Sequence, residues 1–199
     1  IDRLQIKEGK QQHEKVIKLE KATNVPIIAM MYKIPAGNHP DIVAINALSD
    51  ILINNSSSRI KTELKQNQGV VLDAGSFTLE LRKPGYLLAY MIPMNQNEVY
   101  QTRNKFDQEL KRLINQGIKD NELKIVKKAA LKKIIFKQKN ISNAAYTIAK
   151  NAVRYNDPQF YQTEIKRLKD LTEEDIIKVA KKYFIPQNRT IGYIVPKNN

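Results

Sequence analysis

The sequence has no cysteine and no tryptophan, and only two of its 199 residues are histidine. Without cysteine the fold cannot hold a disulfide bond or a thiolate metal site, and this absence fits a reducing cytoplasm and the bacterial periplasm equally well. No stretch approaches the ~18 consecutive apolar residues of a membrane-spanning helix, and no signal peptide opens the chain. Because the chain begins with Ile1 rather than methionine, we expect it to be a piece of a longer protein.

The scarcity of histidine also limits metal chemistry. A peptidase zinc site needs two imidazoles one helical turn apart, with a general base beside them. The sequence offers only His13 and His39, and neither is followed by a glutamate and a histidine at the required spacing. His13-Glu14 begins like a reversed zinc motif, but position 17 is isoleucine. We therefore predict no metal ligand and no catalytic residue in this chain, with His13 on a surface strand and His39 in the turn before a helix.

Positive charge is abundant instead, with a formal net charge of +14 and a pI near 9.8. The densest cluster lies between residues 119 and 139, where lysines alternate with Leu123, Val126, Ala130 and Ile134 at helical spacing. Such a surface would suit an anionic partner. However, the cluster contains no arginine to recognise guanine, and no helix-turn-helix or zinc-finger spacing is present. We therefore predict a solvated lysine face and no nucleic-acid function.

The pattern of apolar residues predicts an α+β domain. Alternation indicates strands at residues 13–21, 26–35, 70–81, 85–93 and 189–195. Helical spacing and breaker residues indicate helices at 41–53, 59–68, 97–117, 120–139 and 141–152, at a segment starting at 157, and at 172–184. The first two strands are predicted to form a hairpin around Asn24. Strands that cluster in this way favour an antiparallel or mixed sheet with helices packed on one face.

The last helix has the best-defined start. Thr172 is the predicted N-cap and Asp175 lies three residues later, while Leu171 and Ile176 occupy the two positions of a hydrophobic staple. The segment from Leu171 to Pro196 resembles the closing segment of a domain of the pitrilysin/insulinase family of zinc peptidases. Three further segments resemble the family in the same order, at residues 38–69, from residue 84 onward, and at 117–123.

This resemblance covers residues 14 to 196. It implies a single non-catalytic C-terminal domain at residues 13–199. Residues 1–12 are polar and irregular, and this composition predicts an inter-domain linker. Family enzymes hold zinc with a histidine-x-x-glutamate-histidine helix and a distant glutamate, so the resemblance implies that zinc binds in another domain of the parent protein. The family's arginine and tyrosine, which bind the substrate backbone, map onto Lys65 and Leu72. Leucine cannot hydrogen-bond a carbonyl, so Lys65 remains a degenerate candidate for substrate binding and is more typical of a solvated helix residue.

The resemblance implies a domain that walls the peptide-binding chamber of a bacterial zinc metalloendopeptidase. The expected partners are the N-terminal catalytic domain of the same parent, a homologous subunit or second copy that supplies the arginine and tyrosine, and peptide substrates. The alternative is an inactive homologue with a purely structural or interaction role. A histidine-x-x-glutamate-histidine motif upstream of Ile1 would favour the enzyme.

The serine run before Arg59 is predicted to be structural. Ser56 or Ser57 is expected to cap the helix that follows, and Arg59 is expected to pair with a carboxylate or carbonyl of the domain. A catalytic serine is disfavoured, because neither a nucleophile-elbow glycine pattern nor a usable histidine accompanies it.

Overall fold

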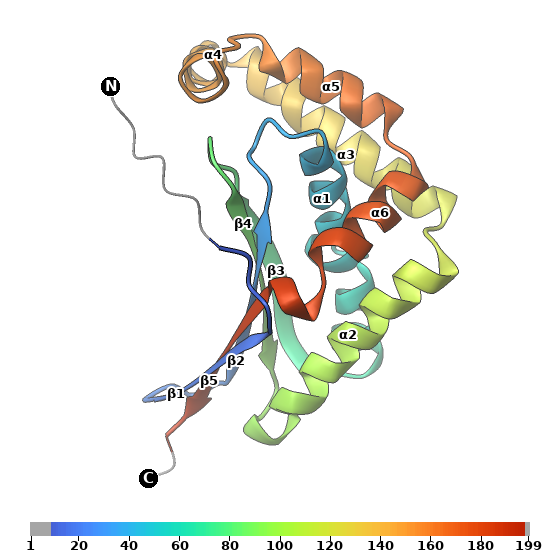
Figure 1. The fold of residues 1–199 in the computed structure, drawn as a ribbon. Coiled ribbons are helices and arrows are strands. Elements are labelled where there is room, and N and C mark those ends of the chain that lie inside the picture. The colour runs from blue at the N-terminus through green and yellow to red at the C-terminus, as the bar shows by residue number, and fades with distance from the viewer. Residues whose placement is uncertain (1–8, 198–199) are drawn as a thin grey trace.

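The structure is a computed structural model that describes residues 9–197, and it consists of one sheet with a layer of helices (Figure 1). The strands are β1 (Lys15–Lys21), β2 (Ile27–Ile34), β3 (Val71–Leu79), β4 (Gly85–Pro93) and β5 (Arg189–Pro196). The helices are α1 (Asp41–Ser49), α2 (Val99–Gln116), α3 (Asp120–Lys139), α4 (Ile141–Tyr155), α5 (Phe160–Asp170) and α6 (Glu173–Tyr183). Short π-helical segments, η1 (Asp50–Asn54) and η2 (Lys61–Asn67), follow α1. None of the helices described is long and apolar enough to cross a membrane.

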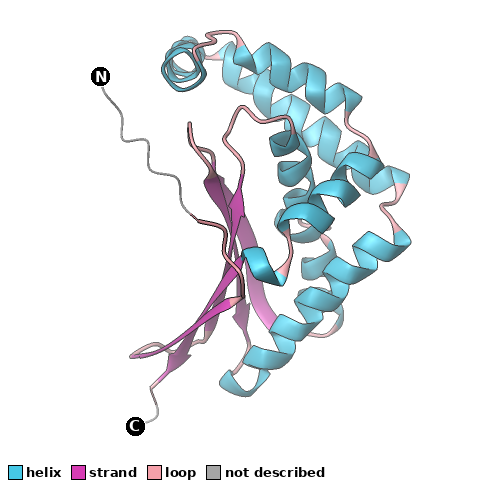
Figure 2. Ribbon diagram, in the orientation of Figure 1, coloured by secondary structure: helices cyan, strands magenta, loops and turns pink. Residues whose placement is uncertain are grey.

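The five strands form one mixed sheet in the order β1-β5-β2-β4-β3. β5 runs parallel to β1, and the remaining neighbours are antiparallel. The helices lie on one side of this sheet (Figure 2). The predicted α+β class, with a mixed sheet covered on one face, is therefore confirmed.

The predicted hairpin around Asn24 is wrong, because β5 lies between β1 and β2 and pairs with both. The connection between the first two strands crosses the end of β5, where the Lys197 amide donates to the Lys21 carbonyl at 3.0 Å. All seven residues of β1 are exposed, whereas every second residue of β5 is buried. The more apolar strand gains more from an interior position, because there both of its edges are paired.

Alternate residues of the central strands bury their side chains under the helices. Ile28, Met30, Tyr32 and Ile34 of β2 are each at most 1% exposed. They pack in one core with side chains from four helical elements: Leu48 of α1, Leu52 of η1, Phe106 and Leu113 of α2, and Ile176 and Val179 of α6. Burial of this alternating set against helical stripes accounts for the one-sided architecture.

The start of α6 matches its sequence signature. The Asp175 amide donates to the Thr172 hydroxyl at 3.2 Å, and the Asp175 carboxylate accepts from the Thr172 amide at 3.0 Å, so both halves of the capping box form. Leu171 and Ile176 are buried, as expected for a hydrophobic staple. Gly117 ends α2 with a positive φ of 81°, which a residue with a side chain rarely adopts.

The apolar stripe of α4 behaves differently from those of the other helices. The helix itself is confirmed, but Ile141 is 87% exposed and Ile148 is 45% exposed. The buried residue of α4 is the polar Asn151, which is 1% exposed. The side of α4 that packs on the domain is thus rotated away from its apolar stripe.

Candidate functional site

The face of the sheet opposite the helices has no covering layer within residues 9–197 (Figure 2). The alternate residues of β2, β3 and β4 that do not enter the core point to it, and they are mostly apolar with two charged residues among them: Ile27, Ala29, Met31, Lys33, Asp73, Phe77, Leu79, Tyr86, Leu88, Tyr90 and Ile92. Phe77 is 57% exposed, Leu79 is 48% exposed and Met31 is 37% exposed. The solvated face of an antiparallel sheet is usually polar, so an apolar face of this kind indicates a binding surface. We call it the open face.

Glycine shapes part of the open face. Gly75 of β3 stands opposite Tyr90 of β4 in the ladder. A Cβ atom at position 75 would lie 2.6 Å from the Tyr90 hydroxyl oxygen. The Tyr90 ring therefore lies across the glycine, and it replaces the missing side chain with flat aromatic surface.

The two positions that the resemblance assigns to the family's arginine and tyrosine, Lys65 and Leu72, lie near the start of the edge strand β3. Lys65 belongs to η2, and its Nζ is 3.3 Å from Oδ1 of Asp73 in β3. Leu72 is 42% exposed at the irregularity of β3, where the register shifts between Val71 and Asp73. Lys65 and the start of β3 are thus adjacent, and Leu72 adds an apolar side chain beside an exposed ion pair.

The pKa of Asp73 reflects this pairing. Partial burial pushes its pKa upward, but the hydrogen bond from Lys65, a backbone hydrogen bond from Ala74 and the charges of Lys65 and Lys61 together lower it below its usual value. Asp73 is therefore a carboxylate that forms an ion pair with the Lys65 ammonium. The sequence could not identify this partner, because only the η2–β3 turn brings the two residues together.

Neither histidine joins a metal site in the part of the chain that the structure describes, where no three histidine, cysteine, aspartate or glutamate side chains could hold a metal ion. His13 is exposed in the bend before β1, which begins at Lys15, so it does not lie on the predicted strand. His39 lies in the turn before α1 as predicted, where its Nδ1 accepts from the Asp41 amide at 3.1 Å. The donor set does not fit the zinc ion of the family's catalytic domains.

The Arg59 prediction is confirmed, and its partner is specific. Arg59 Nε and Nη2 donate to the two carboxylate oxygens of Glu122 at 2.8 and 2.7 Å, and Nη2 also donates to the Gly117 carbonyl at 2.9 Å. The predicted cap by Ser56 or Ser57 is not found. The helical segment instead follows Ser58, whose hydroxyl donates back to the Ile53 carbonyl at 2.8 Å.

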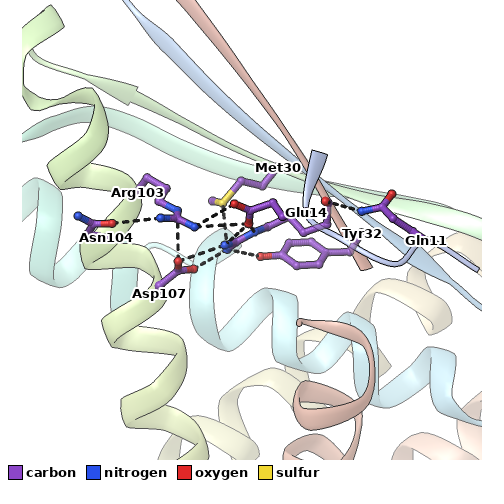
Figure 3. A network of polar contacts seen from close by, with 8 residues as sticks. Gln11, Glu14, Met30, Tyr32, Arg103, Asn104 and Asp107 are labelled. Atoms are coloured by element: carbon purple, nitrogen blue, oxygen red, sulfur yellow. Dashed lines mark hydrogen bonds and ion pairs between the residues drawn. The ribbon is translucent and has the colours of Figure 1, made fainter. Parts of the chain in front are cut away.

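A buried ion-pair network lies at the end of β5 nearest α2 (Figure 3). Arg189 is 2% exposed; its Nε donates to Glu14 at 2.6 Å, and its Nη1 donates to Asp107 and, at 3.2 Å, to the Tyr32 hydroxyl. Arg103 of α2 also bonds Glu14, at 3.1 Å, and lies 3.3 Å from Asp107. Two arginines and two carboxylates therefore balance their charges, as a buried ionic group requires.

Two members of the network, Tyr32 and Arg189, have shifted pKa values. Burial raises the pKa of Tyr32 to about 12, although the neighbouring Arg189 opposes this shift. Burial alone would lower the pKa of Arg189, but the hydrogen bonds to Asp107 and Tyr32 and the charges of both groups together outweigh it, and the pKa is raised. Tyr32 and Arg189 both keep their protons near neutral pH, and the network serves as a structural clamp between β5, α2 and the segment before β1. The sequence contains one indication of this network. Arg189 falls on the same side of β5 as the buried Ile191, Tyr193 and Val195, and a charged residue on the buried side of a strand needs partners.

Comparison with known proteins identifies the class. Residues 3–130 match the peptidase M16 inactive domain. The chain is 27% identical over 193 residues to the zinc protease PqqE of Helicobacter pylori, covering 96% of this chain and 43% of that protein. Its fold superimposes with a TM-score of 0.88 on the crystal structure of a protease from Helicobacter pylori, at 25% identity over 96% of this chain and 46% of that one. The periplasmic protease PqqL of Escherichia coli shares the fold, with a TM-score of 0.75, 16% identity, and coverage of 94% and 21%.

The chain belongs to the peptidase M16 inactive domain family, and the resemblance to the pitrilysin/insulinase zinc peptidases is confirmed. It is a non-catalytic domain homologous to parts of bacterial zinc proteases. It spans 43% of the length of Helicobacter pylori PqqE and 46% of the chain in the Helicobacter pylori protease structure. The prediction that residues 1–12 form a linker lies largely outside the described residues, because residues 1–8 are not among them.

Proposed function

We propose that this chain is the non-catalytic half of a bacterial zinc metalloendopeptidase, and that its open face walls the chamber in which peptides bind. The observation that carries the proposal is the apolar, uncovered side of the sheet, which includes the exposed Phe77, Leu79 and Met31. An apolar wall binds extended peptides by contact with their side chains and excludes water from the chamber.

The relatives support the same role. PqqE of Helicobacter pylori is named a zinc protease, and this chain corresponds to 43% of it. In our proposal the zinc ion and its general base belong to the other half of the parent. A homologous subunit or a second copy supplies the arginine and tyrosine that Lys65 and Leu72 replace here. The open face contributes affinity, not bond cleavage.

The test is peptide hydrolysis by the full parent protein carrying Leu79→Glu or Phe77→Glu. Each change places a carboxylate on the apolar wall, where apolar peptide side chains would otherwise bind. We expect kcat/KM to fall by about tenfold, mostly through KM, because uniform binding is lost. The melting temperature should change little, because both side chains are about half exposed in this domain.

Tyr146→Glu is the matched control, since Tyr146 is 68% exposed on α4 and lies on a helix rather than on the sheet. Its kcat/KM should equal that of the unmodified parent. If the open-face variants hydrolyse peptides as fast as this control, the wall has no part in binding. A parent that carries no zinc and cleaves no peptide would favour the alternative role, an inactive structural homologue.

A further inference from the structure

The strand β1 leaves one edge of the sheet unpaired within residues 9–197. It stands at the end of the strand order, where β5 is its neighbour on one side. All seven of its residues are exposed, so no helix of the described chain covers either face of this strand (Figure 1). Its outer side presents a row of backbone N–H and C=O groups, to which a further strand can bind. We call this side of the strand the β1 edge.

Apolar side chains are exposed on both faces of β1. Ile17 and Leu19 continue the open face, because they stand beside the outward-pointing residues of β5, and they are 49% and 46% exposed. Val16 points to the helix side of the sheet and is 58% exposed. A further strand at the β1 edge would bury part of this apolar surface from both sides.

Lysine on an edge strand usually prevents pairing, and β1 contains three lysines, Lys15, Lys18 and Lys21. Whether this protection holds against a second copy of the chain depends on the order of the charges. The symmetry of most homodimers is a twofold axis. An axis perpendicular to the sheet makes the two β1 strands antiparallel and keeps the helices of both copies on the same side. One residue of β1 then lies at the axis and faces its own counterpart, and this residue defines the register.

One register is self-complementary in charge. When Leu19 lies at the axis, Lys18 of each copy faces Glu20 of the other copy, so two oppositely charged pairs form. Lys21 then faces Ile17, and the third lysine faces a threonine, so no two lysines meet. Within one copy Lys18 Nζ lies 3.3 Å from Glu20 Oε1. The four charged groups at the interface would therefore alternate in sign.

The other registers centred on β1 leave its charges unsatisfied. A charged residue at the axis faces an identical charge, which is destabilising. With Ile17 at the axis, Glu14 faces Glu20. With Val16 at the axis, Glu14 faces Lys18, but the Glu14 carboxylate is already bound in the buried ion-pair network of Figure 3. Only the register centred on Leu19 pairs free charges of opposite sign.

We propose that a second copy of this chain binds at the β1 edge, with the two β1 strands antiparallel and Leu19 at the twofold axis. The two five-stranded sheets then form one continuous sheet, and the two open faces become one surface. The net charge of +14 on each copy opposes association. However, exposed charges farther apart than the Debye length of about 8 Å are largely screened at physiological salt, whereas the pairs of Lys18 and Glu20 attract at contact.

The oligomeric state of the full 199-residue chain tests the interface, and charge reversal tests the register. Sedimentation equilibrium at physiological salt measures the dissociation constant of the dimer. Lys18→Glu and Glu20→Lys should each weaken the dimer by about tenfold, because two attractive pairs become repulsive. The double variant, Lys18→Glu with Glu20→Lys, should restore the affinity of the unmodified chain. Lys178→Glu makes the same change of charge on the exposed side of α6 and should leave the dissociation constant unchanged.

Single cysteines locate the axis directly, because the chain has no cysteine of its own. Facing residues of antiparallel strands have Cβ atoms about 4.5–5.5 Å apart, close to the distance that a disulfide spans. Leu19→Cys should therefore form a disulfide-linked dimer when oxidised with copper phenanthroline. Ile17→Cys is the matched control, since Ile17 lies on the same face and is similarly exposed. Its two copies would be offset by four residues, or roughly 14 Å, and should not cross-link.

Any of four results overturns the proposal. The first is a chain that stays monomeric at every concentration, which would leave the β1 edge to a strand from elsewhere in the parent protein. The second is a dimer that Lys18→Glu weakens no more than Lys178→Glu does. The third is a double variant that associates no better than the single variants, and the fourth is equal cross-linking at positions 17 and 19. Because these side chains are exposed, unaltered melting temperatures will show that the variants are folded.

Discussion

Arg189 connects three parts of the chain that are distant in sequence. Through Glu14 it contacts the segment that leads into β1, through Asp107 it contacts α2, and through Tyr32 it contacts β2. A buried guanidinium is tolerated only because these acceptors surround it. The segment before β1 is thereby anchored to the sheet, as is Gln11, whose amide donates to the Arg189 carbonyl at 2.7 Å.

Arg189→Met should lower the free energy of unfolding by about 3 kcal/mol or more, because Glu14 and Asp107 would stay partly buried without their cation. Urea denaturation followed by circular dichroism measures the change. Arg112→Met is the control: its ion pair with Glu109 is formed by an arginine side chain that is 56% exposed, and the expected loss is below about 1 kcal/mol. Equal losses in the two variants would contradict a special role for the buried network.

Asp50 illustrates the opposite electrostatic situation. Burial raises its pKa, and the hydrogen bond from Asn54 and the charge of Lys133 offset this only in part. Glu164, across the same small cavity between α1, α3 and α5, is also raised, by burial and by the nearby Glu80. Both carboxyls are therefore easier to protonate in the folded domain than in the unfolded chain.

Because the pKa of Asp50 is raised in the folded state, its protonated carboxyl adds to the free energy of unfolding. This contribution is complete below the unfolded pKa, near about 4, and it is lost as pH rises through the folded pKa. Asp50→Asn should remove this loss, because asparagine does not ionise. The free energy of unfolding of the variant should therefore exceed that of the unmodified chain by an amount that grows from about pH 4 toward neutrality. Urea denaturation at several pH values provides the comparison. A difference between the two proteins that does not vary with pH would refute this assignment.

At the scale of elements, the domain is held by links between helix ends. Asp41 in the first turn of α1 accepts from Lys182 Nζ at 2.9 Å and from the Tyr183 hydroxyl at 2.7 Å, both at the end of α6. Partial burial pushes the pKa of Asp41 upward, but the Lys182 and Tyr183 hydrogen bonds outweigh it and the pKa is lowered. The carboxylate also lies at the positive end of the α1 dipole, and so it supports both helices at once.

Arg59 forms the second link, between the segment after η1 and the turn from α2 to α3. Arg59→Ala should lower the free energy of unfolding by about 2 kcal/mol, since a charged hydrogen-bond pair and a bond to the Gly117 carbonyl are removed. Thermal denaturation measures this loss. Peptide turnover by the parent, expressed per folded molecule, should not change. Unchanged stability combined with lost turnover would instead make Arg59 a functional residue.

At the scale of the whole molecule, the open face gives this strongly basic domain an uncovered apolar surface within residues 9–197. It is a larger feature than scattered exposed residues, and it fits a binding role. The exposed stripe of α4, with Ile141 and Ile148, adds to the apolar surface of the domain.

If another subunit or a second copy supplies the arginine and tyrosine, then Lys65→Arg combined with Leu72→Tyr should create no peptidase activity in this chain alone. It should also add little to the assembled enzyme. Changing the supplied pair itself should lower turnover by about 10²-fold, the effect of losing a transition-state hydrogen bond. Peptide hydrolysis is measured with the parent and its candidate partner, separately and mixed. Full activity of a monomeric parent alone would contradict the shared site.

The sequence determined those features that depend on neighbouring residues. The capping box at Thr172, the end of α2 at Gly117 and the helical stripe of α6 all formed as predicted, because caps and periodic burial involve residues within a few positions of one another. The clustering of strands was sufficient for the α+β class. The assignment of Lys65 and Leu72 to the family's arginine and tyrosine positions comes from the resemblance alone and stays a prediction.

Only the tertiary structure decided which distant groups meet. β5 inserts between β1 and β2 because its apolar residues gain most from an interior position, and no local pattern encodes that pairing. The partners of Arg189, the carboxylate beside Lys65 and the exposure of the α4 stripe likewise depend on contacts between residues far apart in the chain. Which side chains are buried is decided when the sheet and the helices pack together. The sequence specifies only which side chains would gain free energy from burial.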